Sequence, residues 1–453
     1  MSSLRQRVWA SRIANPVLWM VLTALGLRIA VILYFRSYNF FAAETSIFAN
    51  ARLLPDAIRH FPFSFGYETG TIAYSLATGR GFSSPFAGST GPTAWLAPLY
   101  PAMCAIVFKI FGSLTLKSSF VILAINSLFA ALTCIPIVKI GEITFSRKVG
   151  LYSGWIWACG VFFMRWSTTA VWETSLSTLL LTIVFLQALR LATNPDWKPW
   201  ARFGLMWGVT ALTSPSLLAF LPASGLYAAD RLRRSHRPWF RPAAISAVVF
   251  VMCISPWMIR NRLVFGQWTF IRDNAPFEFS LGNYHLSTGM GWAGKHPSLN
   301  KREWAKYAAM GEVAYIAEKK AEAMAFVKEY PQEFLGLCVK RFEAFWTGDD
   351  TENSWGRYSL YTSLSALMLL GLIVALVHRT EGAWLYLGMM LFYPITYYLT
   401  FPQPRYRHPI EPEMLLLGTY AVYLAIRDFS AHFRTSAKAE AAESDLQGRL
   451  VEQ

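Results

Sequence analysis

The chain contains about ten stretches of roughly 20 mainly apolar residues, and this feature restricts its fold more than any other. A helix needs about 20 such residues to cross the hydrocarbon core of a bilayer, which is about 30 Å thick. The sequence therefore predicts an all-α polytopic membrane protein. The stretches lie at 14–35, 93–112, 118–139, 149–165, 171–192, 203–229, 242–260, 358–378, 382–401 and 409–427.

The composition agrees with a membrane protein. Hydrophobic residues make up 54% of the chain and charged residues only 15%, which is too apolar for a water-soluble globule. The first stretch is long and contains Arg28, so we interpret it as a signal anchor and not as a cleaved signal peptide. Residues 1–428 are expected to form one membrane domain, and 429–453 a solvated, partly disordered cytoplasmic tail.

The basic residues predict the orientation, because short cytoplasmic loops are rich in Lys and Arg. The N-terminal arginines and the arginines of 231–241 place these segments inside. Simple alternation through all the stretches, however, places the basic groups of 139–148 and 190–202 outside. The conflict disappears if 93–112, interrupted by two prolines, is re-entrant or oblique and if 203–229 splits at Thr213-Ser214-Pro215.

With these two changes both termini face the cytoplasm and two large loops, 36–92 and 261–357, face outward. The second loop is expected to form amphipathic helices between Trp304 and Trp346 that lie over the outer face. The first loop contains a short helix that begins at Glu68 and ends at the Gly79-x-Gly81 sequence. We therefore expect the chemistry of the protein in these two loops.

Several segments resemble the GT-C class of polyprenyl-phosphate-sugar glycosyltransferases. They are the acidic helix followed by Gly-x-Gly-Phe, GPTAWLAPLYP at 91–101, KIFG at 109–112 and RYRHPIEP at 405–412. SRKVG at 146–150, ALTSPSLL at 211–218 and SPWMIRNRLVFG at 255–266 also match. The chain is similar in particular to bacterial relatives of protein O-mannosyltransferases and of the lipid A aminoarabinose transferase, over most of residues 10–428.

The resemblance implies a sugar donor carried on a lipid phosphate and a catalytic acid in the first outer loop. Glu68 is the expected base, since transfer to a hydroxyl needs a group that accepts the acceptor's proton, and one carboxylate suffices for an inverting displacement. Many relatives have a pair of acids there, whereas this chain offers Glu68 alone, with Glu44 and Asp56 upstream. Glu173 is the second catalytic candidate.

The donor phosphate needs cations. We expect Arg405 and Arg407 to bind it, because a guanidinium can pair with two phosphate oxygens, although arginines at a membrane boundary also snorkel to the headgroups. Arg260 is a third candidate for the phosphate, and lipid anchoring is an equal alternative for it. The substrate cavity is expected to include the aromatic and histidine side chains of Tyr67, Trp95, Tyr406 and His408.

The resemblance thus implies an inverting hexosyl- or pentosyltransferase of the bacterial inner membrane, with an active site that faces the periplasm or the outside. Its expected donor is an undecaprenyl-phosphate sugar, and its acceptor is a protein, lipid or glycan. The scattered His60, His285 and His296 predict no protein-built metal site, although a divalent cation remains open, and no motif indicates nucleotide or nucleic acid. A lipid-linked sugar transporter or flippase and a lipid-binding scaffold are the alternatives.

Overall fold

The structure is a computed structural model, and it describes residues 15–40, 65–291, 293–348 and 355–430. Within these ranges the regular elements are helices, and the pairing of Ser83 with Pro92 is an isolated bridge. The expected all-α fold is confirmed. Glu44, Asp56, His60 and the tail from 431 lie outside the described residues.

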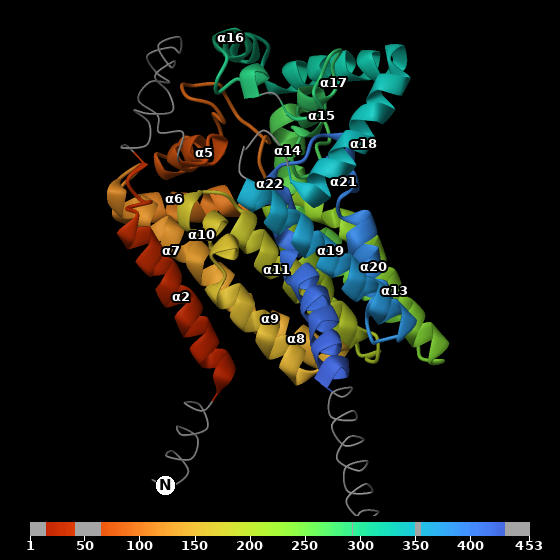
Figure 1. Cartoon of the computed structure of the whole chain (residues 1–453). Coiled ribbons are helices and arrows are strands. Elements are labelled where there is room, and N and C mark those ends of the chain that lie inside the picture. The colour runs from red at the N-terminus through yellow and green to blue at the C-terminus, as the bar shows by residue number, and fades with distance from the viewer. Residues whose placement is uncertain (1–14, 41–64, 292, 349–354, 431–453) are drawn as a thin grey trace, which may run out of the picture.

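The described helices run along the whole chain (Figure 1). In the first half they are α2 (Pro16–Tyr34), α5 (Glu68–Ala77), α6 (Leu99–Phe111), α7 (Leu116–Leu132), α8 (Cys134–Thr144), α9 (Arg147–Cys159), η3 (Val161–Met164), α10 (Arg165–Thr169), α11 (Thr174–Leu191), α12 (Trp197–Thr213), η4 (Pro215–Phe220) and α13 (Leu221–Arg234). In the second half they are α14 (Phe240–Phe265), α15 (Ala275–Gly282), η5 (Ala293–Lys295), α16 (Lys301–Met310), α17 (Glu312–Glu329), α18 (Pro331–Thr347), α19 (Trp355–Val377), α20 (Ala383–Phe392), α21 (Ile395–Leu399), α22 (Pro404–Arg407), η7 (His408–Ile410) and a last helix over 411–430.

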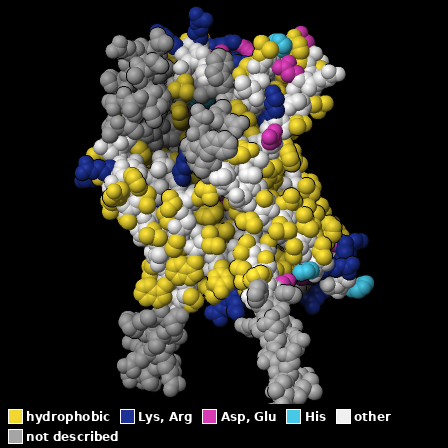
Figure 2. Space-filling model, viewed as in Figure 1, with side chains coloured by type: hydrophobic (Ala, Val, Ile, Leu, Met, Phe, Trp, Pro, Cys, Tyr) yellow, Lys and Arg dark blue, Asp and Glu magenta, His cyan; other side chains and the backbone are white. Residues whose placement is uncertain are grey.

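Among the described residues, 5 helical segments are long and apolar enough to cross a membrane, so the chain is a multi-pass membrane protein. They fall into two groups by burial. In α11 78% of the apolar window is buried and in the continuous Leu116–Thr144 segment 61%, whereas α2, α14 and α19 bury between 17% and 28%. The second group exposes a broad apolar surface, as lipid-facing helices do (Figure 2). The expected total of about ten spans remains a prediction.

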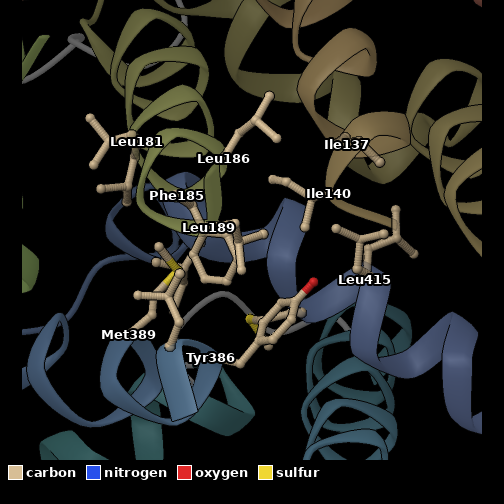
Figure 3. Packing of buried hydrophobic residues seen from close by; sticks show 14 of the residues in the cluster. Ile137, Ile140, Leu181, Phe185, Leu186, Leu189, Tyr386, Met389 and Leu415 are labelled. Atoms are coloured by element: carbon tan, nitrogen blue, oxygen red, sulfur yellow. The ribbon is translucent and has the colours of Figure 1, made fainter. Parts of the chain in front are cut away.

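The largest hydrophobic core surrounds α11. Leu181, Phe185 and Leu189 of this helix pack against side chains of α8, α20 and the last helix, and all three are buried (Figure 3). Tyr386 of α20 lies against Phe185 with ring centroids 4.6 Å apart. Because α11 is buried on most of its surface, it holds its first residues, and the acid that precedes them, in a fixed position.

Arg28, which lies inside the first span, is hydrogen-bonded to backbone oxygens of α2 and α9. Its guanidinium donates to the backbone oxygens of Ala24, Trp157 and Ala158 at 3.0–3.1 Å, and the side chain is fully buried. Trp157 and Ala158 belong to the last turn of α9, whose carbonyl groups lack helical partners and favour a cation. Arg28 therefore fixes α2 to the end of α9.

Both changes to the simple topology agree with the helices. α6 has 13 residues, which is about 20 Å of helix and short of the bilayer core. The stretch 203–229 is interrupted at Ser214, which separates α12 from η4 and α13. The start of α2 and the turns that follow α8, α11 and α13 lie at one end of the molecule (Figure 1).

The other end is formed by the two predicted loops. α5 and the group α15, α16 and α17 lie there, and α18 leads from them back to α19 (Figure 1). The segment from Trp304 to Trp346 is helical as expected. The two loops are thus adjacent, and the space between them contains the candidate site.

Candidate functional site

The start of α5 is held against the segment that precedes α11. Gly66 has φ +80, and a Cβ at this position would lie 2.1 Å from the carbonyl oxygen of Val171, so only glycine allows the close approach. Tyr67 follows with φ 46, an uncommon conformation for a non-glycine residue. Glu68 is the first residue of α5, as the sequence predicts, and α5 ends before Gly79 and Gly81, which both have positive φ.

Glu68 is paired with a histidine from the second loop. The Nε2 atom of His296 lies 2.7 Å from Oε1 of Glu68, and both side chains are about 15% exposed. The Nδ1 atom of His296 accepts a hydrogen bond of 3.1 Å from the backbone N–H of Ser298. A nitrogen that accepts carries no proton, so Nε2 bears the proton and donates it to the carboxylate.

Four aromatic rings fix the orientation of His296. The rings of Tyr67, Phe86, Trp95 and Phe277 lie with centroids 5.4–6.4 Å from its imidazole, in edge-on arrangements. Burial by itself would raise the pKa of Glu68, but the interaction with His296, a backbone hydrogen bond and the charge of Arg405 together outweigh it, and the pKa lies below its ordinary value. Glu68 is therefore ionised at neutral pH.

Glu68 opens into a polar cavity of about 220 Å³ between the two loops. Its charged lining combines three acids with two arginines: Glu68 from α5, Glu173 at the start of α11, Glu278 of α15, Arg272, and Arg405 of α22. The pKa of Glu278 is raised by burial and by the charge of Glu68, although Arg272 opposes the shift. The cavity thus contains carboxylates of different acidity close to two cations.

Arg405 is held in place by its neighbours. Its Nε donates to the side-chain oxygen of Gln403 at 2.9 Å, one terminal nitrogen lies 3.1 Å from the hydroxyl of Tyr406, and its guanidinium lies 4.1 Å from the ring centroid of Trp172. Burial lowers the pKa of Arg405, but Tyr406, Glu173 and Glu278 outweigh burial, and the pKa is raised above its ordinary value. No ion pair of Arg405 with an acid occurs within the described residues, so its charge is directed at the cavity.

A second cavity of about 560 Å³ adjoins the first. Glu173, Arg272, Glu278, Arg405 and Tyr406 line both. The rest of the larger cavity is mainly apolar, with a wall from η4 and another from Tyr393, α21 and the residues after α21. These walls include Pro215, Leu217, Leu218, Ala219, Tyr393, Tyr397, Phe401 and Pro409. One continuous space therefore has a charged end at Glu68 and an apolar end between helices.

The structure brings together five of the residues expected from the sequence: Glu68, Glu173, Tyr67, Arg405 and Tyr406 line these cavities. Arg407 does not face them. It is 1% exposed, pairs with Glu411 and donates to the backbone oxygens of Trp346 and Tyr361, and its neighbour His408 also bonds to Glu411. The α22 turn directs alternate side chains oppositely, so Arg405 and Arg407 cannot form the expected pair.

Arg260 and Trp95 also lie away from the cavity linings. Arg260 donates to the backbone oxygens of Thr93 and Phe82 at 2.7 and 2.8 Å, which ties the end of α14 to the first loop. Trp95 is fully buried beside the ring of His296. Arg260 and Trp95 therefore stabilise the packing around the site and do not line its cavities.

The sequence did not single out His296, Arg272 or Glu278 as site residues. They lie in the second loop, far along the chain from Glu68, and no short spacing connects them to it. Only the packing of α15 and the segment before α16 against the first loop brings them to the cavity. In a single sequence, nothing distinguishes a histidine that will reach an active site through tertiary packing from any other loop histidine.

Within the described residues, no group of three or more His, Cys, Asp or Glu side chains is arranged to hold a metal ion. Glu44 and Asp56, the upstream acids, are not among the residues described. The divalent cation left open by the sequence stays a prediction.

Comparisons with known proteins support the resemblance. Residues 96–259 match the family model of dolichyl-phosphate-mannose-protein mannosyltransferases, which confirms the similarity to GT-C enzymes for this part of the chain. The matched segment contains Glu173, whereas Glu68, His296 and Arg405 lie outside it. A search of curated proteins gives no match.

Two solved structures of the oligosaccharyltransferase from Archaeoglobus fulgidus are similar in shape. One is a complex with zinc and sulfate, with a TM-score of 0.49 and 11% identity over 84% of this chain and 47% of that chain. The other is a complex with an inhibitory peptide and a dolichol-phosphate, with a TM-score of 0.47 and 13% identity over 82% of this chain and 47% of that chain. The present chain thus spans about half the length of these proteins.

Proposed function

We propose that the protein is an inverting glycosyltransferase that moves a sugar from a polyprenyl-phosphate carrier to a hydroxyl group. The observation that supports this most directly is the ionised Glu68, oriented by His296, at the charged end of a space whose other end is apolar. The match to a mannosyltransferase family over residues 96–259 supports the same class of reaction.

Glu68 is the base. Its Oε1 is occupied by the proton of His296, so Oε2 is the atom that accepts the proton of the acceptor hydroxyl. As the acceptor oxygen bonds to the anomeric carbon, the bond from that carbon to the phosphate oxygen breaks, and the lipid phosphate leaves with the electron pair. A phosphate leaves readily as an anion, so the reaction needs no strong general acid.

Arg405 and Arg272 neutralise the departing phosphate. Both line the two cavities, and a guanidinium can bind phosphate oxygens bidentately. Arg405 makes no ion pair with the described acids, whereas Arg272 lies 3.6 Å from Glu278 and would share its charge between this acid and the phosphate. The apolar walls from η4 and α21 accommodate the first isoprene units of the carrier. In this proposal the phosphate lies between the base and the lipid, as the reaction requires.

The finer assignments extend the same proposal. The sugar is a hexose or pentose, the carrier is undecaprenyl phosphate, and the acceptor is a protein, lipid or glycan. The end with α5 and α15–α17 faces the periplasm of a bacterial inner membrane, because the basic turns lie at the opposite end (Figure 1).

Donor turnover tests the proposal against the transporter alternative. The purified protein in lipid nanodiscs is supplied with undecaprenyl-phosphate sugars, labelled in the sugar, together with periplasmic or membrane extracts as acceptors. A transferase releases undecaprenyl phosphate and labels an acceptor, and Glu68→Gln slows both by roughly 10² or more. If the labelled donor instead crosses the bilayer of proteoliposomes unchanged, and no acceptor is labelled, the transporter alternative replaces the proposal.

A further inference from the structure

A third cavity, of about 790 Å³, lies at the opposite end of the molecule from Glu68. It is formed between α13 and α20, and the turn that connects α19 to α20 closes it. None of its lining residues belongs to the two cavities described above. Any ligand of this third cavity would therefore be distinct from a substrate bound in the two cavities near Glu68.

The lining changes from apolar to charged along the helices. On α13 the cavity is lined first by Ala223 and Leu226 and then, one and two turns later, by Arg231 and Arg234. α20 runs in the opposite direction, so Phe392 lies at the apolar end and Trp384 at the charged end. The two helices touch closely near the apolar end, where a Cβ on Gly388 would lie 2.9 Å from that of Ala223.

The charged end contains more arginines than acids. Arg231 pairs with Glu381 at 2.7 Å, whereas Asp230 is shared between Arg234 at 2.6 Å and Arg233 at 3.0 Å, so the charge of Arg234 is only partly neutralised. Tyr227 also donates to Glu381 at 2.8 Å, which fixes the connecting turn on α13. Arg379 is exposed at the rim and makes no ion pair within the described residues, so the cavity has a net positive charge.

The apolar end is open to the surroundings of the protein. Leu226 is 69% exposed and Phe392 44%, and Trp384 at the charged end is 72% exposed. These are large apolar side chains on a helix pair of a membrane protein. Lys and Arg side chains gather at the lower right of Figure 2, where α13 ends, directly beside a hydrophobic surface. The cavity thus has an exposed apolar part next to a cationic part. A molecule with acyl chains and an anionic headgroup is complementary to both parts.

We propose that this cavity binds an anionic glycerophospholipid, with its phosphate at Arg379 and Arg234 and its acyl chains along Leu226 and Phe392. Basic pockets between membrane helices at the cytoplasmic side are suited to anionic lipid headgroups. The glycerol backbone then lies beside Trp384, an aromatic side chain of the kind found at the interface between headgroups and chains. This inference does not rest on the proposed transferase activity.

Native mass spectrometry of the detergent-purified protein tests the inference. Phosphatidylglycerol and phosphatidylcholine of the same chain length are titrated in parallel, and inorganic phosphate is added as a competitor. The wild type is expected to retain one phosphatidylglycerol with a clear preference over phosphatidylcholine. The double variant Arg379→Gln/Arg234→Gln should reduce the affinity for phosphatidylglycerol about fivefold per arginine and leave that for phosphatidylcholine unchanged.

Arg147→Gln is the matched control, because Arg147 is a 71% exposed arginine at the same end but outside the cavity. It should bind both lipids as the wild type does. The proposal is overturned if the double variant keeps the lipid preference, if Arg147→Gln loses it equally, or if millimolar inorganic phosphate displaces the lipid, since the site would then recognise phosphate alone.

Discussion

The Nε2–H group of His296 donates a hydrogen bond to the carboxylate of Glu68 across 2.7 Å, and this contact joins the two long loops in the lining of the polar cavity. The first loop contributes the acid at the start of α5, and the second contributes the group that keeps it ionised and fixes one of its oxygens. The chemistry proposed for the first loop therefore depends on the second.

Glu68→Gln should lower the rate of sugar transfer by roughly 10²–10⁴, because the amide cannot accept the acceptor's proton. Donor binding and thermal stability should change little, since the side chain keeps its size. The measurement is single-turnover transfer from labelled donor. Glu343→Gln, an exposed acid of α18, is the control and should be fully active. A Glu68→Gln rate within threefold of wild type would assign the base elsewhere.

His296→Ala should move the acid limb of the pH–rate profile to higher pH. In the wild type the pKa of Glu68 lies below its ordinary value because His296 outweighs burial, so activity persists down to pH values below that ordinary value. Without the imidazole, burial raises the pKa, and activity is lost at a higher pH. His296→Gln retains a donor and should give an intermediate profile. Superimposable profiles for all three proteins would exclude this role.

Arg405→Ala should weaken donor binding and slow transfer, because the proposed phosphate site loses one of its two cations, and the loss matters more as negative charge develops on the leaving phosphate. Arg405→Lys should restore the activity only in part, since it lacks the planar fork. Donor dissociation constants and single-turnover rates are to be measured. Arg407→Ala should instead lower thermal stability and leave the donor dissociation constant unchanged, because it breaks a buried pair with Glu411. A weaker donor affinity in Arg407→Ala would contradict this assignment.

Glu173→Gln should reduce transfer far less than Glu68→Gln and should tighten donor binding. Glu173 lines both cavities and acts on Arg405, so its negative charge opposes an incoming phosphate. The comparison requires donor affinity and single-turnover rate for each variant. If the larger loss of rate occurs in Glu173→Gln, Glu173 is the base.

Asp273→Asn should stabilise the protein at alkaline pH. Burial and the neighbouring Glu312 raise the pKa of Asp273 from 3.8 to about 9, so the folded state binds its proton more tightly than the unfolded state. This contribution to stability is complete below pH 3.8 and is lost as the pH rises toward 9. Asparagine resembles the protonated acid and avoids that loss. We expect a melting temperature higher by roughly 2 °C or more at pH 8.5, with a smaller difference at pH 5. An equal shift at both pH values would contradict the linkage.

The apolar periodicity was sufficient to predict the helices of the membrane domain. A segment that must satisfy its backbone within a bilayer has few alternatives to a helix, so α2, α11, α14 and α19 follow from local sequence. Prolines also act locally, which is why the break at Ser214-Pro215 could be predicted. The position of Glu68 at the start of α5 follows likewise from its spacing and the glycines after it.

Side-chain direction at the site, in contrast, was decided by tertiary packing. Arg405 and Arg407 are two residues apart in one segment, yet one faces the cavity and the other is buried against Glu411. His296, Arg272 and Glu278 reach Glu68 only because the second loop folds over the first. Local sequence fixes which residues a helix contains, whereas the partners of a charged side chain depend on long-range contacts. The sequence by itself therefore determined the membrane helices and the acid, and the tertiary structure decided which cations and which histidine surround that acid.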